Sequence, residues 1–216
     1  MSDEDWAAAR AAHARGDFAT ELRIYRRLAD LGDARAQNNV GVMCESGLGV
    51  TKSYAEAIGR YRTAADQGFA DAQNNLGVMY EMGHGVPKDP AAAVSWYRLA
   101  ANQGDANAQH NLGNAYESGN GVPQNHAEAV VWFRKAAGQG HPMAQANLGV
   151  MYEHGSGVTQ DLILAYMWFS LSAAGFPASE AKNRGIATRN RDQLAATMNP
   201  AQIAEAQRLA KAWQPG

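Results

Sequence analysis

One asparagine recurs every 36 residues through most of the chain. A primary amide carries both a hydrogen-bond donor and an acceptor, so it can pair with the backbone of an extended peptide whatever that peptide's sequence. Four such amides, one repeat apart, would hold a peptide strand. The same amides could instead brace a neighbouring helix or a loop, and the sequence leaves both roles open. The residues are Asn39, Asn75, Asn111 and Asn147.

A glutamate follows each of these asparagines by six residues, in what we expect to be the last turn of a helix. The helix macrodipole disfavours a carboxylate there by about 0.3–1 kcal/mol, so local propensity does not explain it. Either each carboxylate accepts hydrogen bonds from amides of the glycine-rich loop that follows, or the carboxylates form an acidic groove for a basic partner. The first interpretation is favoured, because bonds from backbone amides to a carboxylate are strong and local. The residues are Glu45, Glu81, Glu117 and Glu153.

Further residues on the same helix face complete a candidate binding surface. Helical winding places Ala72, Leu76 and Tyr80 on one side and the amides with Glu81 on the other. Stacked helices would line a concave groove with this second stripe. We therefore predict a surface that binds a protein or peptide partner and consists of Asn38, Asn39, Asn74, Asn75, Val78, Glu81, His110, Asn111, Asn114, Glu117, Asn147, Val150 and Glu153.

No catalytic or metal-binding set accompanies this surface. Ser179 and Lys182 have the S-x-x-K spacing of penicillin-binding enzymes, but no S-D-N or K-T-G motif accompanies them. The histidines occupy different repeat positions without an i, i+4 pair, and the single cysteine, Cys44, lacks zinc-site neighbours. We predict no catalytic residue, no metal and no cofactor.

The spacing of these residues reflects an internal repeat with a pair of helices in each copy. Apolar residues at three- and four-residue steps predict a first helix over roughly 70–82. Gly83 and Gly85 tolerate positive φ and Pro87 stops the helix, so a loop follows. Asp89 and Pro90 then read as N-cap and first residue of a second helix, which ends near residue 103. Since the Gly-x-Gly-Val loops join helix to helix, we expect turns and not phosphate-binding loops.

The two ends of the chain depart from the period. Residues 1–33 are predicted to form an N-terminal capping pair of helices, and residues 178–216 a C-terminal pair with Gly185 inside its longer member. The fourth copy loses a residue near Gly175. Between the caps, residues 34–177 divide into the copies 34–69, 70–105, 106–141 and 142–177.

The pattern A-x-A-Q-x-N-L-G-x-M-Y-x-x-G-x-G-V-P, followed by A-x-x-W-Y/F-R-x-A-A-x-Q-G, resembles the Sel1-like repeat, a relative of the tetratricopeptide repeat. This resemblance implies an all-α fold, a right-handed α/α superhelix or solenoid. It also implies an adaptor or scaffold role in bacterial and eukaryotic signalling, secretion or quality control, without one shared ligand. Some secreted bacterial members pair cysteines in every repeat and are linked to β-lactam or cell-wall binding. The lone Cys44 disfavours that branch.

Composition limits the remaining function classes. Of 216 residues, 46% are hydrophobic and 19% charged, which predicts a folded chain, and the net charge of -2 argues against a nucleic-acid partner. The acidic start and the lack of a long apolar stretch predict no membrane insertion and a cytoplasmic protein, or a periplasmic one if a leader was removed. The oligomeric state stays open. We predict a non-catalytic scaffold; the alternative is a small-molecule or cell-wall ligand sensor, or a weak β-lactam-type hydrolase.

Overall fold

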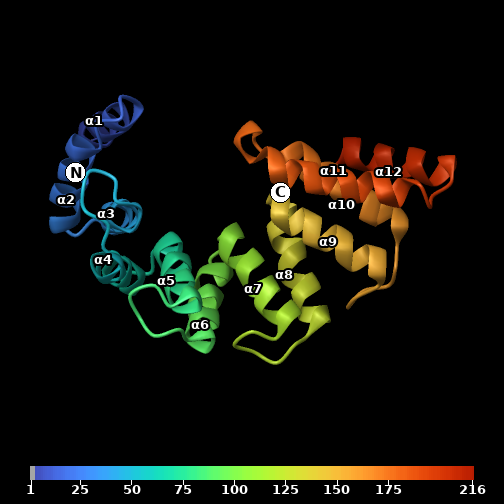
Figure 1. Ribbon diagram of the computed structural model, residues 1–216, viewed down its shortest axis with the longest axis horizontal. Helices are drawn as coiled ribbons and strands as arrows, with labels where there is room; N and C mark the ends of the chain where they lie inside the picture. The colour runs from blue at the N-terminus through green and yellow to red at the C-terminus, as the bar shows by residue number, and fades with distance from the viewer. Residues whose placement is uncertain (1–2) are drawn as a thin grey trace. The chain divides into compact units, whose positions relative to one another are not determined.

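The computed structural model describes residues 3–216, and all regular secondary structure within that range is helical (Figure 1). Twelve α-helices and one short 3-10 helix, η1, follow one another along this part of the chain. The all-α repeat fold that the sequence predicts is confirmed. The chain divides into two compact units, Met1–Gln103 and Gly104–Gly216, which are described separately below.

The first unit consists of three helix pairs, in which each helix packs against the next one in the chain. Its first pair lies within the segment predicted as the N-terminal cap. Helices α3 and α5 open the first two repeats, and α4 and α6 close them. The helices are α1 (Asp3–Ala14), α2 (Phe18–Asp30), α3 (Ala34–Ser46), α4 (Tyr54–Asp66), α5 (Ala70–Met82) and α6 (Pro90–Asn102).

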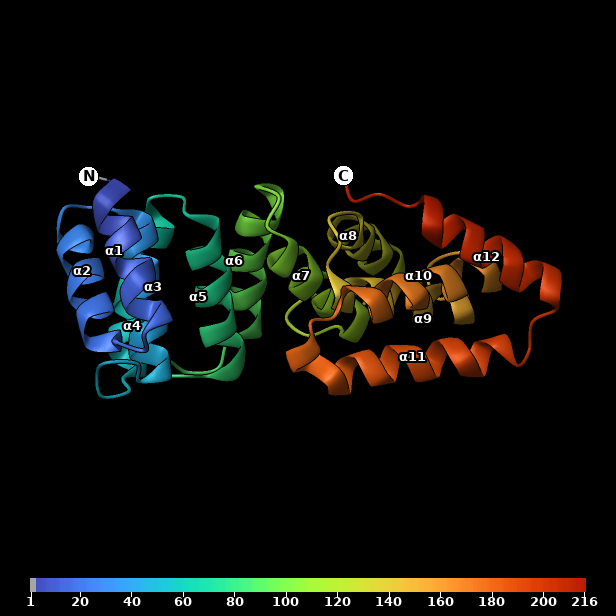
Figure 2. The ribbon, with the colours of Figure 1, turned by 90° about the horizontal axis from the view of Figure 1, so that it is seen from above.

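The second unit holds repeats three and four and the C-terminal helices. Helix α10 packs against α9, α11 and α12 at once, and its sequence LILAYMWFSLSAAG is apolar on all sides, as a surrounded helix requires. Figure 2 shows α11 and α12 on opposite sides of α10. The elements are α7 (Ala106–Ser118), α8 (His126–Gly138), α9 (Pro142–His154), α10 (Leu162–Gly175), η1 (Ala178–Glu180), α11 (Ala181–Ala195) and α12 (Pro200–Ala212).

Within residues 3–216, no single helix is long and apolar enough to cross a membrane. Helix α10 and the segment Ala178–Ala195 reach the necessary length and composition only together, as a pair bent by 119°. Buried residues of α10 belong to the core of the second unit.

Side chains cap several helix starts, among them the start at Asp89 that the sequence predicts. Ser53 accepts a hydrogen bond from the backbone N–H of Glu56, and Asp89 accepts one from that of Ala92. Glu56, which could have returned a bond to close a capping box, instead accepts one from Arg26 on α2 at 3.1 Å. This carboxylate therefore connects α4 to the preceding helix pair.

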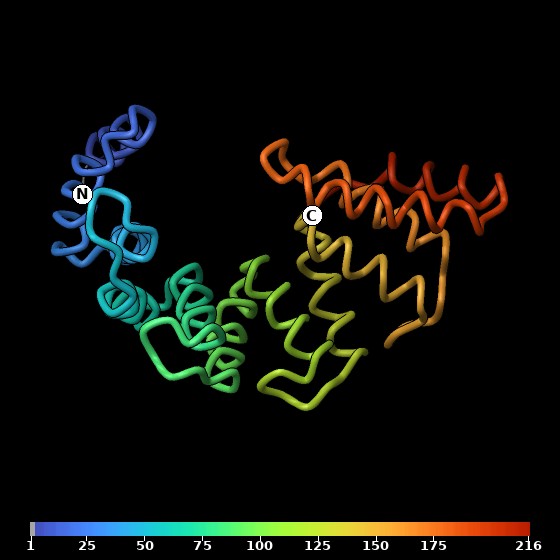
Figure 3. Tube along the Cα trace, in the orientation of Figure 1, coloured from blue at the N-terminus to red at the C-terminus, as the bar shows by residue number. Residues whose placement is uncertain are grey.

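Two glycines shape the loop inside each repeat, and Figure 3 traces these loops. The first ends the opening helix in the left-handed region, as at Gly47 with φ 74°. The second makes a close contact: a Cβ on Gly49 would lie 2.5 Å from the carbonyl oxygen of Phe18, at the start of α2. The loops are turns between helices, and the loop at Gly49 packs on the preceding helix pair.

A pair of glutamines ties each of the first three repeats together. Gln37 donates to the carbonyl oxygen of Ala29, at the end of the preceding helix, and its own side-chain oxygen accepts from Gln67 at 2.7 Å. Equivalent glutamine pairs join residues 73 and 103 at 2.7 Å and residues 109 and 139 at 2.8 Å. The amides of Gln37 and Gln73 thus both donate and accept a hydrogen bond.

The fourth repeat lacks the second glutamine of this pair. Gln145 donates to the carbonyl oxygen of Ala137, yet its own Oε1 is buried and accepts no hydrogen bond from residues 3–216. Gly175 stands where the other repeats have the donating glutamine, and its Cβ position would lie 3.7 Å from this oxygen. A buried acceptor without a donor costs about 1–3 kcal/mol.

Replacing Gly175 with glutamine should therefore stabilise the protein. Gly175→Ala provides the matched control, since both variants gain helix propensity and share the same tight contact of Cβ with Pro142. We expect Gly175→Gln to exceed Gly175→Ala by about 0.5–1.5 kcal/mol in the free energy of unfolding, measured in urea. Equal stability of the two variants would show that the amide does not reach Gln145.

Candidate functional site

The opening helices of the four repeats, α3, α5, α7 and α9, carry all the predicted site residues, and we call the side that bears them the A-helix face. Its geometry depends on an aromatic residue in the closing helix of the same repeat. The ring of Tyr61 lies against Gly41, where a Cβ would approach Cε1 to 2.6 Å. Its hydroxyl then reaches one turn further along α3 and donates to Glu45 at 2.7 Å.

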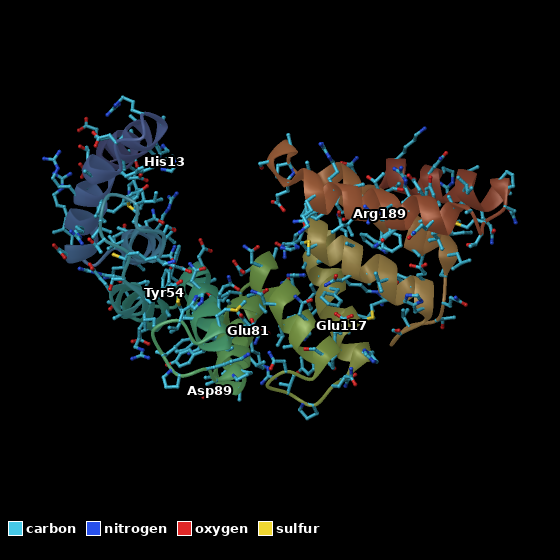
Figure 4. All side chains as sticks on the ribbon, viewed as in Figure 1. His13, Tyr54, Glu81, Asp89, Glu117 and Arg189 are labelled. Carbon is cyan, nitrogen blue, oxygen red and sulfur yellow. The ribbon has the colours of Figure 1, made fainter. Side chains whose placement is uncertain are left out.

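The second repeat contains the same hydrogen bond. Tyr97 donates to Glu81 at 2.6 Å, and Glu81 is labelled in Figure 4. Burial first, and then the neighbouring carboxylate, raise the pKa of Tyr97 well above its usual range. The proton therefore stays on the tyrosine, which is the donor of this hydrogen bond.

Phenylalanine replaces this tyrosine in repeats three and four. Phe133 and Phe169 lie against Gly113 and Gly149 in the same way, but they have no hydroxyl to donate. Burial raises the pKa of the Glu117 carboxyl, an effect that the charge of His126 partly offsets. The glutamates therefore recur in every repeat while their partners change.

The interpretation that loop amides hold these carboxylates is wrong for Glu45, which accepts its hydrogen bond from the Tyr61 hydroxyl. In the third repeat the loop is held differently: the Gln124 side chain donates to the backbone carbonyl of Glu117 at 2.7 Å. A last-turn carbonyl is an unsatisfied acceptor of the helix, so it attracts such a donor.

The asparagines of the first unit brace adjacent helices. Asn75 donates from Nδ2 to Oδ1 of Asn38, one repeat earlier, at 2.9 Å. Asn39 hydrogen-bonds with the Tyr25 side chain on α2. Asn38 and Asn74, which the sequence predicts as partner contacts, are only 5% and 8% exposed. The bond from Asn75 places Asn38 at the contact with the following repeat.

A similar network occupies the A-helix face of the second unit. Asn147 donates to Oδ1 of Asn114 at 2.9 Å, and the amide nitrogens of both asparagines lie 3.3–3.4 Å from Nε2 of His110. Amide nitrogens only donate, so Nε2 is the acceptor and the ring proton belongs on Nδ1. Asn111 also hydrogen-bonds with His110.

His110 stacks on His141 with the ring centroids 4.8 Å apart. Burial, and then the nearby His141, lower the pKa of His110 to about 4. Burial also lowers the pKa of His141, whose Nδ1 caps α9 by accepting the backbone N–H of Ala144. Both rings are therefore neutral parts of the scaffold at pH 7.

The first unit has a cavity of about 340 Å³ at its A-helix face, between α1, α2 and α3. Its buried polar group is Glu21, which is 5% exposed and accepts from Nδ1 of His13 at 3.0 Å. Residues of both the capping pair and the first repeat line it: Arg10, His13, Glu21, Tyr25, Asn39, Val42, Met43 and Leu48.

The second unit has a cleft of about 140 Å³ between α9 and α11, extending to Phe176. Its α9 wall includes Asn147 and Val150, which occupy the same repeat positions as Asn39 and Val42 of the first cavity. The same two positions thus line a hollow in each unit. The residues are Met143, Ala146, Asn147, Val150, Phe176, Asn183, Ile186, Ala187 and Asn190.

The remaining predicted residues are partly exposed on the opening helices: Val78, Glu81, Glu117 and Glu153.

Sequence reasoning missed Glu21, although the sequence contains a signal for it. The repeat period aligns it with an alanine in all four copies, so a carboxylate at that position marks a change of environment. The residues of α11 carried no such signal, because they lie outside the period.

Ser179 and Lys182 lie exposed in η1 and in the first turn of α11. Within residues 3–216, no three His, Cys, Asp or Glu side chains gather in an arrangement that could hold a metal ion.

A model of the Sel1 repeat family matches residues 34–69, 70–105, 106–141 and 142–175. The chain belongs to the Sel1 repeat family. The fourth match ends two residues before the boundary expected from the period. Sel1 repeat proteins are generally protein-interaction scaffolds, and the fold is typically non-catalytic.

Solved structures of other Sel1 repeat proteins are similar to this one. A Sel1 repeat protein from Oxalobacter formigenes is 28% identical, with a TM-score of 0.70 over 95% of this chain and 98% of that one. A protective antigen of uropathogenic Escherichia coli with the same fold is 29% identical, with a TM-score of 0.57 over 90% of this chain. This chain spans only 48% of that antigen. Comparison with curated proteins gives no match.

The tyrosine bond predicts that the four glutamates contribute unequally to stability. Glu45→Ala leaves the buried Tyr61 hydroxyl without its acceptor, so it should lower the free energy of unfolding by about 1–3 kcal/mol. Glu153→Ala is the matched control, since Phe169 takes the tyrosine's place and a last-turn carboxylate opposes the helix dipole. That variant should be neutral or slightly stabilised in the same urea titration. Equal losses of stability in the two variants would show that the tyrosine bond does not distinguish the glutamates.

The network around His110 predicts an acid-sensitive fold. Its folded pKa of about 4 lies below the ordinary 6.5, so between these values the unfolded chain binds more protons. The contribution of neutral His110 to the free energy of unfolding is fully present above pH 6.5 and is lost as the pH falls toward 4, by at most about 3.5 kcal/mol at ~1.4 kcal/mol per pKa unit.

His110→Asn should remove this part of the pH dependence, because repeats one and two carry asparagine at the same position. Urea titrations at pH 7.5, 6.0 and 4.5 measure it. If the free energy of unfolding falls as steeply with decreasing pH in the variant as in the original protein, the acid sensitivity belongs to other groups.

Proposed function

We propose that this protein is a non-catalytic scaffold that binds a protein or peptide partner on its A-helix faces. The observation that carries the proposal is the recurrence of one asparagine and one valine at the wall of a hollow in both units. Asn39 and Val42 line the first, Asn147 and Val150 the second. The scaffold role of the family in general supports the same conclusion.

Each hollow offers a peptide two kinds of contact. The valines supply apolar surface, and Val42 is 38% exposed. The amides supply hydrogen bonds beyond those that brace the helices: the side-chain oxygen of Asn147 accepts none from residues 3–216. The two roles left open for the asparagines are thus compatible, since one N–H can brace a helix while the oxygen meets a partner.

The alternative of a small-molecule sensor draws on the same first cavity. Its 340 Å³ falls at the lower end of the range for ligand pockets, about 300–1,000 Å³. However, Glu21 already hydrogen-bonds with His13 and Tyr25, and Asn39 with Tyr25. Few polar groups remain to orient a small ligand, which favours a side chain anchored by a longer partner.

A large side chain in the first cavity should weaken partner binding without unfolding the protein. We expect Val42→Arg to weaken a partner captured from native lysate at least tenfold, a change of about 1.4 kcal/mol. Leu99→Arg is the control, because Leu99 is similarly exposed, at 49%, on the closing helix α6. Calorimetry with the purified partner and a thermal melt on the same samples measure both effects. If the partner binds the two variants with equal affinity, the A-helix face of the first unit is not part of the binding site.

A further inference from the structure

The cleft between α9 and α11 combines neutral amides with apolar side chains and has no charged residue in its lining. Asn147 and Asn190 face it from the two helices. Within residues 3–216, Asn190 makes no side-chain hydrogen bond and the oxygen of Asn147 accepts none, so donors and an acceptor remain for a ligand. Paired amide donors and acceptors are the groups that match a peptide backbone.

Two exposed apolar side chains stand on the opposite walls of this cleft. Met143 on α9 is 38% exposed and Ile186 on α11 is 44% exposed. The 140 Å³ between the walls equals the liquid volume of roughly four to five water molecules, the size of one branched aliphatic side chain. The cleft therefore fits a single apolar anchor and not a whole helix.

The charge of α11 specifies what should flank that anchor. The helix carries four basic residues against one acid, Asp192, which is already paired with Arg191 at 2.7 Å. Lys182 and Arg189 lie one turn either side of Ile186 and form no ion pair with residues 3–216 (Figure 4 labels Arg189). Glu180, the acid at the start of this helix, is hydrogen-bonded by Asn183. Unpaired cations beside an apolar slot favour an acidic partner.

We propose that the cleft between α9 and α11 binds an extended acidic peptide segment through one aliphatic side chain. The aliphatic group enters between Met143 and Ile186, the backbone pairs with Asn147 and Asn190, and acidic residues on either side meet Lys182 and Arg189. This inference rests on the proposed function, because it assumes that the A-helix faces receive peptide partners.

A designed probe tests the proposal on the full chain. The probe is a fluorescein-labelled peptide, Ser-Gly-Asp-Glu-Leu-Asp-Glu-Gly-Ser, titrated with protein at low salt and followed by fluorescence anisotropy. We expect saturable binding that weakens at least tenfold when the leucine becomes serine, and at least tenfold when the four acids become glutamine. No binding of the original probe, or preference for a lysine-flanked version, would overturn the proposal.

Matched protein variants locate the binding. Ile186→Glu should weaken the probe at least tenfold, whereas Val131→Glu, at a residue 43% exposed on α8, should not. Arg189→Glu should weaken it several-fold more than Arg184→Glu, which alters the other side of α11. Equal effects within either pair would reduce the binding to unspecific attraction and overturn the proposal. Thermal melts confirm that each variant is folded.

The two proposals fail in different ways. If the peptide cleft is wrong but the scaffold function is right, the probe results fail while the natural partner still distinguishes Val42→Arg from Leu99→Arg. If the A-helix faces bind no partner, both comparisons fail.

Discussion

The contact between one aromatic ring and one glycine sets the geometry of every repeat. In each copy the ring of the closing helix lies where a Cβ on the opening helix would approach within 2.5–2.7 Å, from Gly41 with Tyr61 to Gly149 with Phe169. Any side chain on that glycine would force the two helices apart. Because the contact fixes their separation, it also fixes which residues of the opening helix point to the core and which remain on the A-helix face.

Amide hydrogen bonds, more than ion pairs, connect one repeat to the next inside each unit. Gln37 and Gln73 donate to the end of the preceding helix, and Asn75 donates to Asn38. These bonds are buried or half-buried, where an unsatisfied amide would be costly, so they specify the register between repeats. In the fourth repeat Gly175 replaces the donating glutamine, and the side-chain oxygen of Gln145 is left without a donor among residues 3–216.

The period, the helices and their caps could be predicted from the sequence because they depend on residues close together in the chain. The partner of a given side chain could not. Glu45 recurs like Glu153, yet Glu45 accepts from a tyrosine whereas phenylalanine takes the tyrosine's place in the repeat of Glu153. Asn38 looks exposed on a helical wheel, although it is buried and accepts from Asn75 of the following repeat. Those outcomes depend on which neighbouring helix packs against the residue, and a single helix does not contain that information.

The hollows arise where the repeat pattern ends. Beside the first repeat, the capping pair brings Glu21 to a position that is alanine in every copy, and a cavity follows at Asn39 and Val42. Beside the fourth, α11 packs on α10 and leaves a cleft along Asn147 and Val150. Repeated positions supply common chemistry, an amide and an aliphatic group, whereas the caps supply side chains that occur once. We therefore expect specificity for a partner to reside at the junctions of the caps with the repeats, since there a wall of repeated positions meets a wall of residues that occur once.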